Sequence, residues 1–222
     1  MRSTTAITLA ILLSIIGTAC QTTVSSDAVS IPAQKSSDLI TWLTWSQVPE
    51  TVRRGHPGLP YEICDELLSR HEVEYLLASL NSINDEEGRA MLVSRVLYQI
   101  DDERIYKAFA IRLDDKETEE SYYVANYLAK HGHTAALATL NKHYFRYPVS
   151  SWQWSYTVEL FGKYKYQPAV NNLIASLDAA SWNVAQAACD ALRALFPDSP
   201  AHFDGPVEAK DYYINQLRNG QS

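Results

Sequence analysis

The sequence predicts an all-α fold, an α-solenoid of about five stacked helical hairpins with a cap at each end. First, four stretches of the chain align on Leu97, Leu128, Phe161 and Leu192, which lie 31, 33 and 31 residues apart. Second, each stretch contains two successive apolar patterns with helical spacing. A fixed period of about 30 residues made of two helices is typical of stacked helical repeats, in which neighbouring hairpins bury apolar faces that one hairpin alone would expose.

The aligned stretches keep mostly apolar residues at the same offsets from each anchor, and we expect these positions to form the core. In the first helices they are Val93, Val124, Thr157 and Ala188, then Val96, Tyr127, Leu160 and Ala191, then Ile100, His131, Tyr164 and Leu195. In the second helices they are Ile105, Ala136 and Ala169, then Phe109, Leu140 and Leu173, then Leu113, Tyr144 and Leu177. Leu68 extends the register backwards, with Cys64 before it and Leu76 and Leu80 after it.

Residues 1–19 are predicted to be an export signal peptide. Arg2 supplies the positive start, Ala6 to Ile16 form an apolar stretch, and Gly17-Thr18-Ala19 provides small residues for cleavage. The apolar stretch is too short to span a bilayer, which needs about 20 residues. A transmembrane anchor is therefore the weaker interpretation.

Cys20 follows the cleavage site, and Thr18-Ala19-Cys20 resembles the lipobox of bacterial lipoproteins. The resemblance implies that Cys20 carries a diacylglycerol, with palmitate-type acyl chains, and becomes the mature N-terminus. Gly17 departs from the usual Leu, Val or Ile, and the alternative is an ordinary signal peptide followed by a chance cysteine. Because Gln21 rather than Asp comes next, the resemblance implies the outer membrane, with the protein facing the periplasm.

Residues 20–37 are predicted to be the lipidated cysteine and a flexible tether, because this stretch is rich in Ser and Thr and has no apolar period. Residues 38–222 are then a single helical domain, with residues 38–54 as an N-terminal cap. We expect the first helices at 61–70, 86–100, 117–131, 151–164 and 182–195, and their partners at 72–81, 103–113, 134–146, 168–177 and 207–218. Cys64 and Cys189 fall in core positions of distant repeats, so we expect buried free thiols rather than a disulfide.

The stretch from Val184 to Leu192 resembles the inner helix of HEAT repeats, in the short bacterial version called the PBS-lyase type. Gly162-Lys163 followed by Pro168-Ala169-Val170 is similar to the helix–turn–helix junction of that family. The resemblance covers about residues 60–220, although Ala185 stands where the family usually has Arg. It implies an α-solenoid that binds a protein along its concave face and has no catalysis of its own.

The candidate partner-binding residues are those whose helical angle points away from the predicted core. They are Glu119, Tyr123, Asn126 and Lys130, then Trp152, Tyr156, Glu159 and Lys163, then Leu92, Arg95 and Gln99. We expect Leu92, Tyr123 and Tyr156 to form a row beside Trp152, since exposed aromatic residues in a polar frame are common interface anchors. The alternatives are coverage by the C-terminal segment, partial burial or, for the aromatic run at 144–166, a platform for the sugar rings of peptidoglycan.

Composition limits the other functional classes. The chain has a net charge of −7, which argues against nucleic-acid binding. His131, His133 and His143 could suggest a metal site, but His131 shares a core position and His133 lies in a turn. The sequence contains no recognisable catalytic motif. We therefore expect no metal, no cofactor and no enzyme activity.

The leading functional hypothesis is a lipid-anchored periplasmic scaffold or adaptor that holds an unknown protein partner on its concave face. The membrane contact would come from the lipid anchor. Two alternatives stay open: an enzyme or an enzyme accessory, since some PBS-lyase-type proteins help to attach bilins, and a cell-wall binder.

Overall fold

The computed structural model describes residues 30–55, 58–113, 118–144 and 151–219. The predicted signal peptide, Cys20 and the first part of the predicted tether lie outside these ranges. No helix within them is long and apolar enough to cross a membrane.

The described part of the chain is all-α and contains no strand, as predicted. The N-terminal elements are η1 (Ile31–Ala33), α2 (Ser36–Trp42), η2 (Trp45–Gln47) and α3 (Glu50–Gly55). They are followed by α4 (Leu59–Arg70), α5 (Val73–Leu80), α6 (Glu86–Met91), η3 (Leu92–Val96), η4 (Leu97–Gln99), α7 (Glu103–Arg112) and α8 (Glu119–Lys130). The last elements are α9 (Ala136–His143), α10 (Ser151–Lys163), η5 (Gln167–Ala169), α11 (Val170–Ser176), α12 (Trp182–Leu195) and α13 (Pro206–Asn219).

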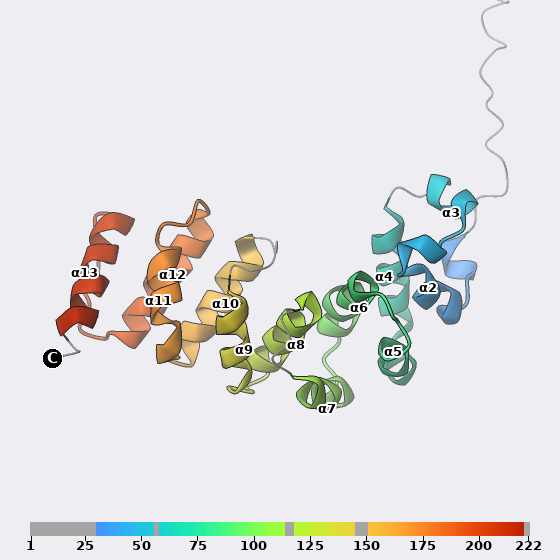
Figure 1. Ribbon diagram of the computed structural model, residues 1–222, viewed down its shortest axis with the longest axis horizontal. Coiled ribbons are helices and arrows are strands. Elements are labelled where there is room, and N and C mark those ends of the chain that lie inside the picture. Colours follow the sequence, from blue (N-terminus) through green and yellow to red (C-terminus); the bar gives the residue numbers. More distant parts are fainter. Residues whose placement is uncertain (1–29, 56–57, 114–117, 145–150, 220–222) are drawn as a thin grey trace, which may run out of the picture.

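The helices form an elongated, bent row, with α2 and α3 at one end and α13 at the other (Figure 1). Each helix packs mainly on elements near it in the sequence, as in the contacts α4–η3, α6–α8, α8–α10 and α10–α12. α5 contacts α7, and α11 contacts α13. In the middle of the row, α6 and α8 lie on the inner side of the bend, and α5, α7 and α9 on its outer side (Figure 1).

The predicted register of buried positions is largely confirmed. The anchors Leu97, Leu128, Phe161 and Leu192 are all fully buried, and so are the positions four residues before them. The three second-helix positions are also buried, except that Leu113 is only partly covered. His131 was expected in the core but is exposed, because it follows the last residue of α8 and lies beside the ring of Tyr127.

The prediction that Leu92 forms an exposed row with Tyr123 and Tyr156 was wrong, since Leu92 is fully buried. The reason is the π-helical turn η3, which begins at Leu92. A π turn holds about one more residue than an α turn. Side chains that precede Leu97 across this turn therefore point in directions that differ by about one residue position from those expected for a continuous α-helix. Met91, one residue earlier, is the partly exposed residue instead.

The N-terminal boundary also differs from the prediction. Residues 31–36 were assigned to the tether, yet they form η1 and the start of α2, and Ile31 is buried. Arg70 of α4 fixes this segment by donating hydrogen bonds to the hydroxyl of Ser36 at 2.9 Å and to the carbonyl of Gln34 at 2.9 Å. The folded part therefore begins before residue 38.

Both described cysteines are free thiols, as expected. Cys64 is buried, and burial raises the pKa of its thiol to about 12. Cys189 was expected in the core but is only half-buried, because it lies at the edge of a surface cavity beside Phe203 and Arg193.

α10 and α12 pack very closely, and Gly162 makes this approach possible. A Cβ placed on Gly162 would lie 2.7 Å from the Cα of Ala191 and 2.9 Å from its Cβ. Real carbon atoms do not approach so closely, so any larger residue would push the two helices apart. The Gly162–Ala191 contact therefore sets the spacing of this helix pair.

We predict that Gly162→Ala lowers the free energy of unfolding by about 1–3 kcal/mol, the usual range for overpacking a core. In an uncrowded helix the same change would raise stability by about 0.5–1 kcal/mol, because glycine is a poor helix former. Chemical denaturation distinguishes the two signs. A stabilised variant would show that α10 and α12 are not in close contact.

Candidate functional site

The candidate site is a shallow depression on the side of the first helices that was predicted to point away from the core. Its walls are Ser94, Arg95, Tyr98, Gln99, Tyr122, Tyr123, Asn126, Gln153 and Tyr156, contributed by η3, η4, α8 and α10. Its volume is only about 40 Å³. Pockets for small molecules usually measure about 300–1,000 Å³. The depression therefore suits a side chain of a docked partner better than an enclosed ligand. We call the surface formed by Arg95, Tyr98, Tyr123, Gln153 and Tyr156 the tyrosine face.

A buried hydrogen-bond network lies directly beneath the tyrosine face. The hydroxyl of Tyr98 donates to Oδ1 of Asn126 at 2.7 Å, and Nδ2 of Asn126 donates to the hydroxyl of Thr157 at 3.0 Å. The Thr157 hydroxyl in turn donates to the carbonyl of Gln153 at 3.1 Å. It can therefore accept from Tyr122, whose hydroxyl lies 2.8 Å away. The network joins η4, α8 and α10.

The expectation that Asn126 is exposed was wrong. Only 3% of it is exposed. Its amide occupies the space between Tyr98 and Thr157, and each neighbour satisfies one end of it. Asn126 borders the depression, but it acts as a support of the tyrosine face rather than as a contact on it.

Tyr123 and Tyr156 lie where the sequence placed them, on neighbouring first helices and on the wall of one depression. Both are half-buried and pack partly on the core. The hydroxyl of Tyr123 accepts a hydrogen bond from Nε2 of Gln153 at 3.1 Å, and its ring packs edge-on against Tyr122. Burial raises the pKa of both tyrosines, so their hydroxyls are neutral hydrogen-bonding groups at physiological pH.

The predicted cations are exposed, and each lies over a tyrosine ring. The guanidinium of Arg95 is 5.0 Å from the ring centre of Tyr61, and Nζ of Lys130 is 5.2 Å from that of Tyr98. Nζ of Lys163 is 5.1 Å from the ring centre of the adjacent Tyr164. Arg95 lines the depression, whereas Lys130, Lys163 and the exposed Glu159 lie outside its walls.

Trp152 was predicted to flank the row of aromatic residues. It belongs to α10, but its side chain lies outside the described residues. Sequence reasoning missed Tyr98 and Gln153, which line the depression. Each is next in sequence to a position that was predicted to point outward, but adjacent residues of a helix are rotated by about 100°, which places both at the border between the outward side and the core side. Their meeting in one depression depends on the distance between helices, for which the sequence carries no signal.

Most of the described aromatic residues in the run at 144–166 pack on the core. Trp154 and Phe161 are buried, and so is Tyr144, whose ring packs edge-on against both. Tyr164 and Tyr166 are partly covered by the same core. These five aromatic residues therefore contribute to the packing of the helical row.

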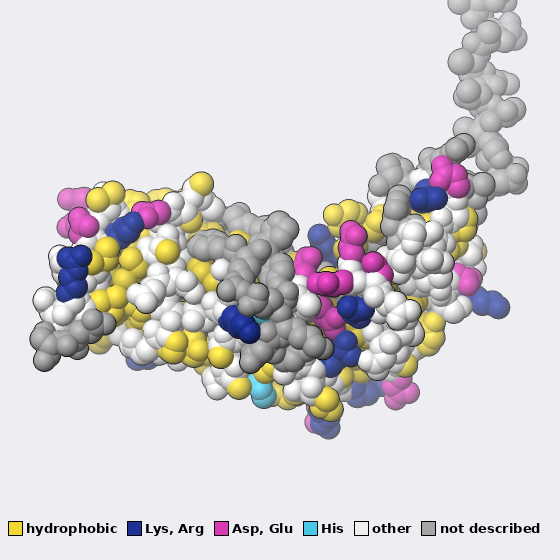
Figure 2. All heavy atoms as spheres, in the orientation of Figure 1, with side chains coloured by type: hydrophobic (Ala, Val, Ile, Leu, Met, Phe, Trp, Pro, Cys, Tyr) yellow, Lys and Arg dark blue, Asp and Glu magenta, His cyan; other side chains and the backbone are white. Residues whose placement is uncertain are grey.

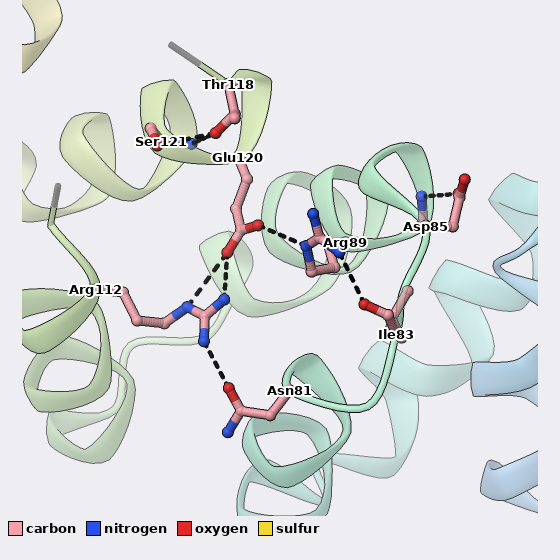
Figure 3. Close-up of polar contacts among 9 residues, drawn as sticks. Asn81, Ile83, Asp85, Arg89, Arg112, Thr118, Glu120 and Ser121 are labelled. Atoms are coloured by element: carbon pink, nitrogen blue, oxygen red, sulfur yellow. Dashed lines mark hydrogen bonds and ion pairs between the residues drawn. The ribbon is translucent and has the colours of Figure 1, made fainter. Parts of the chain in front are cut away.

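A larger cavity, of about 500 Å³, lies beside the ends of α5 and α7 and the start of α8. Its polar wall is an ion cluster in which Glu120 bridges two arginines (Figure 3). Glu120 lies 2.9 Å from Nε of Arg89 and 2.6 Å from one terminal nitrogen of Arg112. The other terminal nitrogen of Arg112 donates to Oδ1 of Asn81 at 2.6 Å. The arginines already have partners, so the cluster fastens three helices together. Figure 2 shows acidic and basic side chains side by side near the middle of the molecule.

The described histidines and acids do not converge on a metal site, since no group of three or more His, Cys, Asp or Glu side chains in this part of the chain could hold an ion. Tyr106 hydrogen-bonds to Nδ1 of His133 at 3.2 Å, which gives that histidine a structural partner.

Comparison with protein families, curated proteins and solved structures finds no match to this chain.

We predict that Thr157→Val lowers the free energy of unfolding by about 1–3 kcal/mol, because it leaves the buried amide of Asn126 without its acceptor and leaves the hydroxyl of Tyr122 only the carbonyl of Gln153, 3.4 Å away. Valine keeps the shape of threonine, so the loss reports hydrogen bonding rather than packing. Thr41→Val is the matched control, since Thr41 is exposed and should change stability by no more than about 0.5 kcal/mol. Urea denaturation of both variants makes the comparison, and equal effects would mean that the network adds nothing.

Proposed function

We propose that this protein is a lipid-anchored scaffold or adaptor that faces the periplasm and binds a protein partner on the tyrosine face. In this proposal the helices form a HEAT-like α-solenoid of about five hairpins, and the tyrosine face lies on its concave side. The protein acts by binding and holds no metal or cofactor.

The observation that carries the proposal is the meeting of Arg95, Tyr123 and Tyr156 on one depression, from three successive first helices. Tyrosine and arginine are enriched at the centres of protein interfaces, because they combine a large contact area with hydrogen-bonding groups. The buried network beneath them holds the surface in one shape before binding, which reduces the entropy lost on association.

The solenoid assignment is supported by the repeated burial. Positions 31–33 residues apart are buried in successive helices, and each helix packs on its sequence neighbours. Such an array offers a long surface whose equivalent positions lie side by side, which suits an extended segment of a partner.

The proposed location, a lipid anchor in the membrane, rests on the sequence of residues 1–20. A signal peptide followed directly by Cys20 fits lipidation at that residue. Two acyl chains of a diacylglycerol suffice for stable anchoring, whereas one chain gives only marginal binding.

We predict that Cys20→Ser moves the protein from the membrane fraction to the soluble periplasmic fraction, because the thioether-linked lipid supplies the membrane affinity. Fractionation and intact-protein mass spectrometry measure the change. Cys64→Ser is the control and should stay lipidated. The proposed lipid anchor would be contradicted if the Cys20→Ser variant remained in the membrane fraction, or if the mass of the wild-type protein showed no attached lipid.

We predict that Tyr123→Ala together with Tyr156→Ala weakens capture of the partner from solubilised envelope by more than about 2 kcal/mol, the loss typical of aromatic anchors. Tyr75→Ala is the matched control, since Tyr75 is 38% exposed and belongs to α5, which contributes no residue to the depression. Melting temperatures of all variants are measured alongside.

If the double variant keeps its melting temperature and still captures the partner, the binding surface lies elsewhere. If wild-type protein is retained on peptidoglycan and captures no stoichiometric protein, the cell-wall alternative replaces the scaffold.

A further inference from the structure

Three cations of the first helices, Arg95, Lys130 and Lys163, lie over aromatic rings and form no ion pair within the described ranges, whereas Arg193 lies over Phe203 and also pairs with Asp190. Arg70, Arg89, Arg104 and Arg112 likewise form ion pairs with carboxylates. In a chain of net charge −7, unpaired cations clustered on one surface are unexpected by composition alone.

Two of these cations are close to the depression that Tyr98 lines. Lys130 lies over the ring of Tyr98, and Arg95 lines the depression of which Tyr98 forms a wall. The hydroxyl of Tyr98 is used inside the protein, where it donates to Asn126. The ring is thus held in place from below, while the two cations keep their N–H groups free for a partner.

A tyrosine ring attracts a cation through its negative π face but leaves the cation's positive charge uncompensated. A carboxylate that approaches from solvent can therefore bind the guanidinium or ammonium group without displacing an internal acid. This differs from the Glu120 cluster, where a carboxylate already occupies both arginines.

We propose that the tyrosine face binds an acidic segment of a protein, with carboxylates seated on Arg95 and Lys130 near Tyr98. The proposal rests on the proposed function and names the chemistry of its partner. Lys163, at the position on α10 equivalent to that of Lys130 on α8, extends the same surface by one helix. Carboxylates also lie on this side of the molecule: Glu159 is exposed, whereas Glu119, at the start of α8, is half-buried, hydrogen-bonds to Tyr123 and lies close to Glu86 and Glu87. The face therefore selects a segment whose acidic groups align with the cations.

The test uses the full-length lipidated protein in neutral detergent and fluorescein-labelled peptides in which glutamate alternates with proline. Matched peptides replace every glutamate with glutamine or with lysine. We expect the glutamate peptide to bind at low salt, the other two to bind at least about tenfold more weakly, and binding to fall as salt screens the charges.

Arg95→Gln with Lys130→Gln should weaken binding of the glutamate peptide at least about tenfold, with an unchanged melting temperature. Lys107→Gln is the matched control, because Lys107 is an exposed lysine on α7 that pairs with Glu103. It should leave binding unchanged. Arg95→Lys should retain part of the affinity, since it keeps the charge but loses the planar guanidinium.

The outcomes separate this inference from the proposed function. If the tyrosine double variant loses the envelope partner while the Arg95 and Lys130 variant and salt have no effect, the scaffold stands and the acidic partner is wrong. Equal binding of the glutamate and glutamine peptides also overturns the inference. Retention of anionic phosphatidylglycerol vesicles, but of no acidic peptide, through the same two cations would assign the face to lipid head groups instead.

Discussion

The middle of this molecule depends on one buried hydroxyl group, that of Thr157. It accepts hydrogen bonds from Asn126 and Tyr122 and donates one to the carbonyl of Gln153. Because a buried donor without an acceptor costs about 1–3 kcal/mol, the groups around it are confined to one arrangement. Through Asn126 the same arrangement reaches Tyr98. Three successive first helices are therefore joined by directional bonds rather than by apolar contact alone.

The interface between α10 and α12 depends on small residues rather than on hydrogen bonds. α10 and α12 meet through Gly162 and Ala191, whose backbones nearly touch. α8 and α10 meet instead through large side chains, including Tyr122 packed against Trp154. Small residues bring helices together and large ones separate them, so the spacing of the row changes at α10. The wider interface leaves room for a depression at the surface, and the tyrosine face lies there.

The charged groups of the tyrosine face are positioned by residues of the same buried hydrogen-bond network. The hydroxyl of Tyr98 bonds inward to Asn126, while Lys130 stacks on the ring from outside. Arg95 stacks on Tyr61 in the same manner. Arg89 and Arg112, in contrast, both pair with the carboxylate of Glu120, and this cluster joins α6, α7 and α8. Arg95 and Lys130 therefore differ from these two arginines in having an aromatic ring, and no carboxylate, as their neighbour within the described residues.

The sequence by itself determined the helices and the repeating set of buried positions, since helical period and burial of residues such as Leu128 and Phe161 follow from local spacing. It also placed Tyr123, Tyr156 and Arg95 on one surface. Only the tertiary structure decided which outward positions stay exposed. Leu92 is buried because a π turn shifts its phase, and Asn126 because Tyr98 and Thr157, from two other helices, close over it. Both depend on geometry between turns or between helices, which the period of a single helix does not encode.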